Sequence, residues 1–164
     1  MGQCLSGDNM VFELNNITLD IDIEKTAEFH AGLQTVAESC GCVGCRNYDM
    51  ACGSFPVAVR EFFSMLGMNI EKATEIIPWY VEDEEGKMYY GGFYHLCGKI
   101  IKGDECWKDN GELNLHEICE GYSVGFTTEI SLPEENLPHP ALQMEVFFHG
   151  VPWMLDEENP YQDI

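Results

Sequence analysis

The sequence predicts an α+β fold in which two or three helices pack on a largely antiparallel sheet of about five or six strands. Helix-like periodicity is confined to the middle of the chain, and segments with strand-like alternation come before and after it. Strands and helices do not alternate, as a parallel α/β fold would require. A chain of 164 residues with 45% apolar residues suits one domain core better than two. We therefore expect a single domain over residues 1–164.

The first part of the chain predicts a β-hairpin followed by a helix. Val11–Leu14 and Ile17–Ile23 flank the pair Asn15–Asn16, and the second segment alternates apolar with polar residues. Residues 23–38 fit both the helical and the strand period, and we interpret them as a helix.

The clearest helix signal follows Pro56. Proline suits the start of a helix, and Gly67 supplies the stop. Between them the apolar residues have the spacing of an amphipathic helix: Val57, Val59, Phe62, Phe63 and Leu66. A second, short helix is expected from Asn69, as its cap, to Ile76.

From Pro78 onwards the pattern is that of strands. Residues 79–81 and 88–101 flank a charged turn and predict an antiparallel pair, and Tyr122–Leu132 and Leu142–His149 predict two more strands. The segment 156–164 is expected to be a loose acidic tail.

Alternation divides the predicted strand 88–101 into two faces. One face carries Tyr89, Gly91, Phe93, His95 and Cys97, and the other carries Tyr90, Gly92, Tyr94, Leu96 and Ile100. The Gly91–Gly92 pair indicates a bulge or a close approach of another group to the backbone.

The net charge of −21 is unevenly distributed. From Asp109 to Ile164 there are twelve acidic residues and no Lys or Arg. Such a surface repels phosphate groups, so we expect neither direct nucleic acid binding nor binding to an anionic membrane. The apolar runs are also shorter than the roughly 20 residues of a membrane span.

The cysteines indicate a reducing compartment. The first ten residues lack the basic start and apolar run of a secretory signal, so we expect a cytoplasmic protein in which clustered cysteines bind metal or remain free thiols. The full set is Cys4, Cys40, Cys42, Cys45, Cys52, Cys97, Cys106 and Cys119.

The pair Cys42–Cys45 has the spacing that lets two thiolates reach one zinc ion around a tight turn. Cys40 and His95 are the first candidates for further ligands, which predicts a structural zinc site at Cys42, Cys45, Cys40 and His95. Free buried thiols and redox chemistry remain alternatives. A redox role needs the motif at the start of a helix, and the sequence places the next helix near Pro56.

Cysteine nucleophiles are a further alternative, because Cys97 lies near His95 and Cys119 near His116 in the sequence. The chain contains none of the common nucleotide-binding, hydrolase or metalloprotease motifs. No catalytic residue is predicted.

Several blocks taken together resemble a family of small uncharacterised bacterial proteins. The blocks are CxCxxCRN at Cys40–Asn47, Phe55–Pro56, Leu66–Met68, YGGFYH at Tyr90–His95 and PWMLDE at Pro152–Glu157. The resemblance implies no activity. It implies that Cys42, Cys45 and His95 belong to a shared pattern and that Cys52, Cys97, Cys106 and Cys119 do not.

The sequence therefore favours a non-enzymatic, acidic binding or regulatory protein. Its partner would be a protein with a basic surface, as for the small acidic inhibitors of phages and mobile elements that imitate nucleic acid, including anti-restriction and anti-CRISPR proteins. The alternative is a small metal-dependent enzyme or ligand-binding protein that uses the Cys/His site. The sequence does not indicate an oligomeric state.

Overall fold

The long strand β5 (Met88–Lys102) is the centre of the fold. The computed structural model describes residues 2–4 and 9–162. On one side β5 pairs with β8 (Ala141–Val151), and on the other it pairs in turn with β4 (Glu75–Val81) and β3 (Ile17–Asp22). All these pairings are antiparallel, so three strands depend on the register of β5.

The remaining strands extend the sheet at both ends. β1 (Gly2–Cys4) and β2 (Asn9–Leu14) continue it beyond β3, and β7 (Tyr122–Thr127) and β6 (His116–Cys119) continue it beyond β8. The order is β1-β2-β3-β5-β8-β7-β6, with β4 beside β5. The predicted α+β class is confirmed, and the described residues form eight strands rather than five or six.

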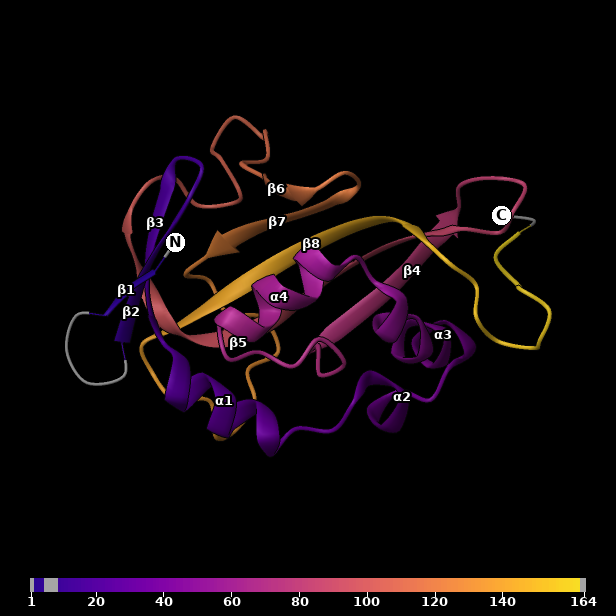
Figure 1. Ribbon diagram of the computed structural model, residues 1–164, viewed down its shortest axis with the longest axis horizontal. Coiled ribbons are helices and arrows are strands. Elements are labelled where there is room, and N and C mark those ends of the chain that lie inside the picture. The colour runs from indigo at the N-terminus through magenta and orange to yellow at the C-terminus, as the bar shows by residue number, and fades with distance from the viewer. Residues whose placement is uncertain (1, 5–8, 163–164) are drawn as a thin grey trace.

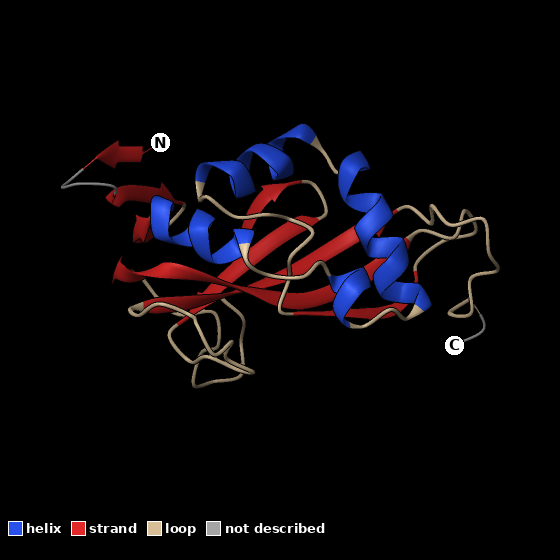
Figure 2. Cartoon of the chain, turned by 90° about the horizontal axis from the view of Figure 1, so that it is seen from below, coloured by secondary structure: helices blue, strands red, loops and turns tan. Residues whose placement is uncertain are grey.

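The helices lie together against one face of this sheet (Figures 1 and 2). They are α1 (Ile23–Ala31), α2 (Val36–Ser39), α3 (Val43–Ala51) and α4 (Val57–Met65), with a short 3-10 turn at Cys52–Ser54. The helix predicted after Pro56 is therefore confirmed. The segment 23–38, interpreted as one helix, contains two, because the chain turns between Gly32 and Thr35.

Aromatic side chains form the contact between helices and sheet. Phe55 packs edge-on against Tyr48 of α3 and Phe148 of β8, and Phe63 of α4 packs against Tyr94 of β5. All five rings are almost completely buried. Such edge-to-face pairs add specific geometry to the area that they bury.

The two predicted faces of β5 are confirmed. Tyr90, Tyr94 and Leu96 belong to the core under the helices, and Gly91 lies on the opposite face beneath the ring of Trp79. A Cβ on Gly91 would lie 2.1 Å from the Trp79 ring. The Gly91–Gly92 pair therefore marks a close approach, as the sequence indicated.

Helix α1 fills a gap between the two partners of β5. Pairing with β4 ends at Phe93 and pairing with β3 begins at Gly98. Between them the Cys97 N–H donates to Thr26 Oγ1 (3.0 Å), and His30 Nε2–H donates to the His95 carbonyl (2.8 Å). One helical turn advances four residues by about 6 Å, close to the roughly 6.6 Å of two strand residues. Two side chains of one helix can therefore reach two backbone groups on the same strand edge.

His30 has the protonation state that this contact requires. The Asn69 N–H donates to its Nδ1 (3.0 Å), so the proton is on Nε2 and the ring is neutral. Burial lowers the pKa of His30 and favours the same neutral form.

The predicted helix from Asn69 to Ile76 is wrong. The Asn69 side chain instead accepts the Glu71 N–H in a turn, and β4 has already begun at Glu75. The Thr74 N–H donates to the Phe93 carbonyl (2.9 Å), so pairing with β5 determines the conformation here. In the described residues no helix is long and apolar enough to cross a bilayer.

Replacing Thr26 by Val tests the contact between α1 and β5. Valine keeps the branched shape but leaves the buried Cys97 N–H without an acceptor, which costs about 1–3 kcal/mol. Urea unfolding measures the loss. Thr18→Val on β3 is the control, because the Thr18 hydroxyl hydrogen-bonds no group in the described residues. Equal losses in the two variants would contradict the proposed role of α1.

Candidate metal centre

The sequence Cys40–Cys45 forms the junction between two helices. Cys40 ends α2, and Cys42 is the N-cap of α3, where its Sγ accepts the Cys45 N–H (3.4 Å). Gly41 between them has φ +74°, a conformation that glycine adopts readily. The junction therefore reverses the chain and turns three cysteines towards one point.

The three Sγ atoms of Cys40, Cys42 and Cys45 lie within 4.8 Å of one another. Cys40 and Cys42 are exposed, and Cys45 is buried. In a tetrahedral zinc site with Zn–S bonds of about 2.3 Å, sulfur atoms are about 3.8 Å apart. A small inward movement of the side chains would therefore give three zinc ligands.

The thiols have opposite tendencies to ionise. The Cys42 backbone N–H and the neighbouring thiols hydrogen-bond Cys40 and lower its pKa. Burial, followed by the two other thiols, raises the pKa of Cys45 well above its usual range. A bound cation would remove the repulsion between three thiolates, so metal binding and deprotonation are coupled here.

Gly44 allows the centre to pack tightly. A Cβ at this position would lie 2.6 Å from Pro78 Cγ and 2.8 Å from the Tyr161 hydroxyl. The Gly44 carbonyl accepts a hydrogen bond from the Tyr90 hydroxyl (2.8 Å), which fixes the first turn of α3 to β5. Tyr161, which the sequence did not single out, thus lies beside the thiols, and burial followed by the nearby Cys42 raises its pKa.

Asn47 and Arg46 of the CRN motif hold the C-terminal segment. Asn47 Nδ2 donates to the Pro152 carbonyl (3.1 Å) and to the Tyr90 hydroxyl (3.1 Å), and Asn47 Oδ1 accepts the Met154 N–H (2.6 Å). The Arg46 guanidinium binds both carboxylate oxygens of Glu157. The separate CRN, YGGFYH and PWMLDE blocks therefore meet in space.

The prediction of a loose tail over 156–164 is wrong for residues 156–162. Besides the Arg46 contact, the Glu157 carbonyl accepts the Trp153 indole N–H (2.9 Å), and Asn159 is buried against Met88. Asp163 and Ile164 lie outside the described residues.

The structure does not bring His95 to the thiols. In the described residues the candidate ligand group consists of Cys40, Cys42 and Cys45 alone. His95 lies on the face of β5 opposite to Tyr90, and its Nδ1 contacts Glu134 Oε1 (2.6 Å) while its Nε2 contacts Gln143 Oε1 (2.9 Å). The prediction that His95 completes the site is corrected, because successive side chains of a strand point to opposite faces.

The thiols meet one of the two structural conditions for redox chemistry. The sequence placed the nearest helix at Pro56, but α3 begins at Val43 and the Cys42–Cys45 pair caps it. A helix N-terminus stabilises thiolates. However, β5 and its neighbours form an antiparallel sheet rather than the βαβ frame of thioredoxin-like proteins, so the second condition of the redox interpretation is not met.

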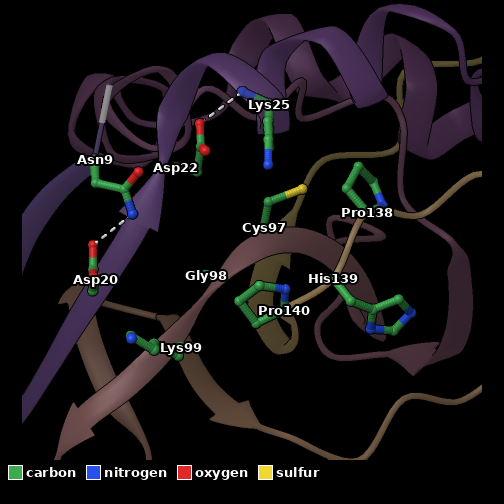
Figure 3. A pocket seen from close by; sticks show the side chains of 10 residues that line it. All are labelled: Asn9, Asp20, Asp22, Lys25, Cys97, Gly98, Lys99, Pro138, His139 and Pro140. Atoms are coloured by element: carbon green, nitrogen blue, oxygen red, sulfur yellow. Dashed lines mark hydrogen bonds between the residues drawn. The ribbon is translucent and has the colours of Figure 1, made fainter. Parts of the chain in front are cut away.

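The proposed cysteine nucleophiles have no support in their surroundings. Cys97 lies in the wall of a hollow of about 210 Å³, into which Lys25 points (Figure 3). Burial raises the pKa of Cys97 and of Cys119, which keeps both thiols protonated. Both ring nitrogens of His95 already face other groups.

No family model, curated protein or solved structure matches this chain.

Replacing Asn47 by Ala should release the C-terminal segment from α3. The change removes three hydrogen bonds and leaves the buried Tyr90 hydroxyl with fewer partners, so we expect a loss of about 2–4 kcal/mol in stability. Hydrogen exchange should show earlier exchange at Met154 than in the wild-type protein. Exposed Asn136→Ala is the control, and unchanged protection of Met154 in the Asn47 variant would contradict the anchoring role.

Proposed function

We propose that the protein binds one zinc ion through Cys40, Cys42 and Cys45. The observation that supports this is the convergence of three thiol sulfurs within 4.8 Å at a helix N-terminus. Thiolates are soft ligands and select zinc among the common divalent ions of the cell. The helix dipole and the nearby Arg46 favour the negative charge that three thiolates leave around a divalent ion.

The proposed role of the zinc ion is structural. It fixes the α2–α3 junction, and α3 in turn holds the C-terminal segment through Asn47 and Arg46. The described residues supply three ligands, so a water molecule or a small anion takes the fourth position in this proposal. The proposed site consists of three thiolates and does not include His95.

Zinc binding to the protein depleted of metal tests this proposal. We expect one zinc ion per chain, with an affinity that falls as the pH is lowered from 8 to 6, because protons compete for the thiolates. Cys42→Ser should weaken binding beyond the roughly 10–100-fold effect of losing an outer-shell contact. Competition with a chromophoric chelator measures both effects.

Two control variants test whether the loss of zinc affinity is specific to the three thiols. Cys119→Ser removes a thiol on β6 and should leave the affinity unchanged. His95→Gln should also retain zinc binding, since His95 is outside the ligand group. Equal affinity of the Cys42 variant and the wild-type protein would refute the site.

We also infer that the acidic segment 109–164 binds a basic surface of a protein partner. The specific observation is that this lysine- and arginine-free segment supplies β6, β7 and β8, which are adjacent in the sheet. Glu117 of β6 and Glu145 of β8 thus lie on strands that are separated only by β7. A groove that normally binds nucleic acid is the kind of basic surface that this charge would occupy.

A nona-arginine peptide provides a defined probe for the acidic segment 109–164. Binding should weaken at least tenfold between 50 and 300 mM NaCl, because salt screens exposed charges. Glu117→Gln, Glu120→Gln and Glu129→Gln together should weaken it further at 50 mM. The matched control neutralises Glu13, Glu28 and Glu61 outside this segment, and an equal loss in both triple variants would contradict a localised site.

A further inference from the structure

The face of the sheet opposite to the helices carries a row of aromatic and acidic side chains. Along β8 this face presents Gln143, Glu145 and Phe147, while Phe148 points into the core. Phe93 of β5 is paired with Glu145, and Gly91 with Phe147. No helix covers this face in Figure 2, which shows loops beneath part of it.

A hollow of about 230 Å³ lies on this face between the sheet and two loops. Phe93 and the half-exposed Trp107 provide aromatic walls, and Glu129 and Glu145 provide carboxylates. The volume is below the roughly 300–1,000 Å³ of pockets for drug-sized ligands. The hollow therefore suits a single side chain or a small molecule.

The polar side chains at the base of the hollow are fixed in orientation. Gln143 Oε1 accepts the Ser131 N–H (2.7 Å) and faces His95 Nε2 (2.9 Å), so its Nε2 is directed to Glu145 Oε2 (2.7 Å). Gln143 itself is buried. This arrangement holds the Glu145 carboxylate in one position at the edge of the hollow.

No Lys or Arg among the described residues forms an ion pair with Glu145 or Glu129. Burial raises the pKa of the half-buried Glu145, the Gln143 hydrogen bond and nearby His95 lower it in part, and nearby Glu75 raises it further. A cation in the hollow would relieve both of the effects that raise this pKa.

The chemistry of the walls distinguishes between cations. Apart from the three thiols, no three metal-ligating side chains of the described chain converge, so the hollow does not resemble a metal site. Aromatic faces combined with carboxylates suit an organic cation. A planar guanidinium stacks on aromatic rings and binds carboxylates with two parallel hydrogen bonds, which an ammonium group does not do.

We propose that this hollow binds the guanidinium group of an arginine side chain from the basic partner, with Trp107 stacked on the group and Glu145 and Glu129 as its acceptors. The proposal rests on the basic-partner function inferred above and specifies its anchor. The neighbouring aromatic side chains Trp79, Tyr89 and Phe147 continue the same face, where the partner chain would lie.

The probe for this site is Nα-acetyl-arginine amide, with the citrulline analogue as its neutral counterpart. Two-dimensional NMR should show saturable shifts at Trp107 and Glu145 with the arginine compound. The citrulline compound should bind at least tenfold more weakly, because it lacks the charge. Equal binding of the two compounds, or shifts confined to other residues, would overturn the proposal.

Two variants test the proposed contacts. Glu145→Gln and Trp107→Ala should each weaken binding of the arginine compound about tenfold, while Trp107→Phe keeps most of the affinity. Glu61→Gln on α4 makes the same change of charge on the helical side and should have no effect. Unchanged binding in the Glu145 variant would overturn the site.

Binding of the nona-arginine peptide shows whether only the proposed hollow is wrong or the basic-partner function as a whole. If the peptide binds with the expected salt dependence but Glu145→Gln and Trp107→Ala leave its affinity unchanged, the hollow is overturned and the acidic surface remains. If peptide binding is independent of salt, the basic-partner function itself fails.

Discussion

The fold depends on how the two edges of β5 are satisfied. A buried strand must pair its backbone N–H and C=O groups, and β5 is longer than any one of its partners on the β3–β4 side. β8 covers one edge, whereas the other edge is shared by β4, α1 and β3. The side chains of Thr26 and His30 replace the missing strand at the junction. This contact fixes α1, and through it the hairpin β2–β3, relative to the rest of the sheet.

The alternation of β5 separates two chemically different regions. Tyr90 points towards α3, where it contacts Gly44 and Asn47 beside the three thiols. Phe93 and His95 point to the other face, where the loops carrying Glu134 and Trp107 cover them in part. The cluster of three thiols and the aromatic, acidic hollow therefore lie on opposite sides of one strand and share no residue. We expect that changes in one region can be made without direct contact with the other.

The candidate metal site was only partly predictable. The spacing of Cys40, Cys42 and Cys45 identified its members, because short spacing restricts where three thiols can be. The sequence did not show that α3 begins within the motif, since Gly44 lowers its helix propensity and its stability comes from packing against Tyr90 and Pro78. The prediction that His95 is a zinc ligand is wrong because the YGGFYH block does not reveal on which face of the sheet α3 packs.

The sequence by itself determined the α+β class, the two faces of β5, the helix after Pro56 and the acidic character of residues 109–164. These features follow from local periodicity and composition, which are properties of each segment by itself. Only the tertiary structure decided that residues 69–76 form a turn and a strand, that residues 156–162 are anchored to α3, and that His95 faces away from the thiols. Each of these depends on hydrogen bonds between segments far apart in the chain, such as Thr74 with Phe93 and Asn47 with Met154. The hollow between Trp107 and Glu145 also depends on the tertiary structure, because a loop and the sheet form it together.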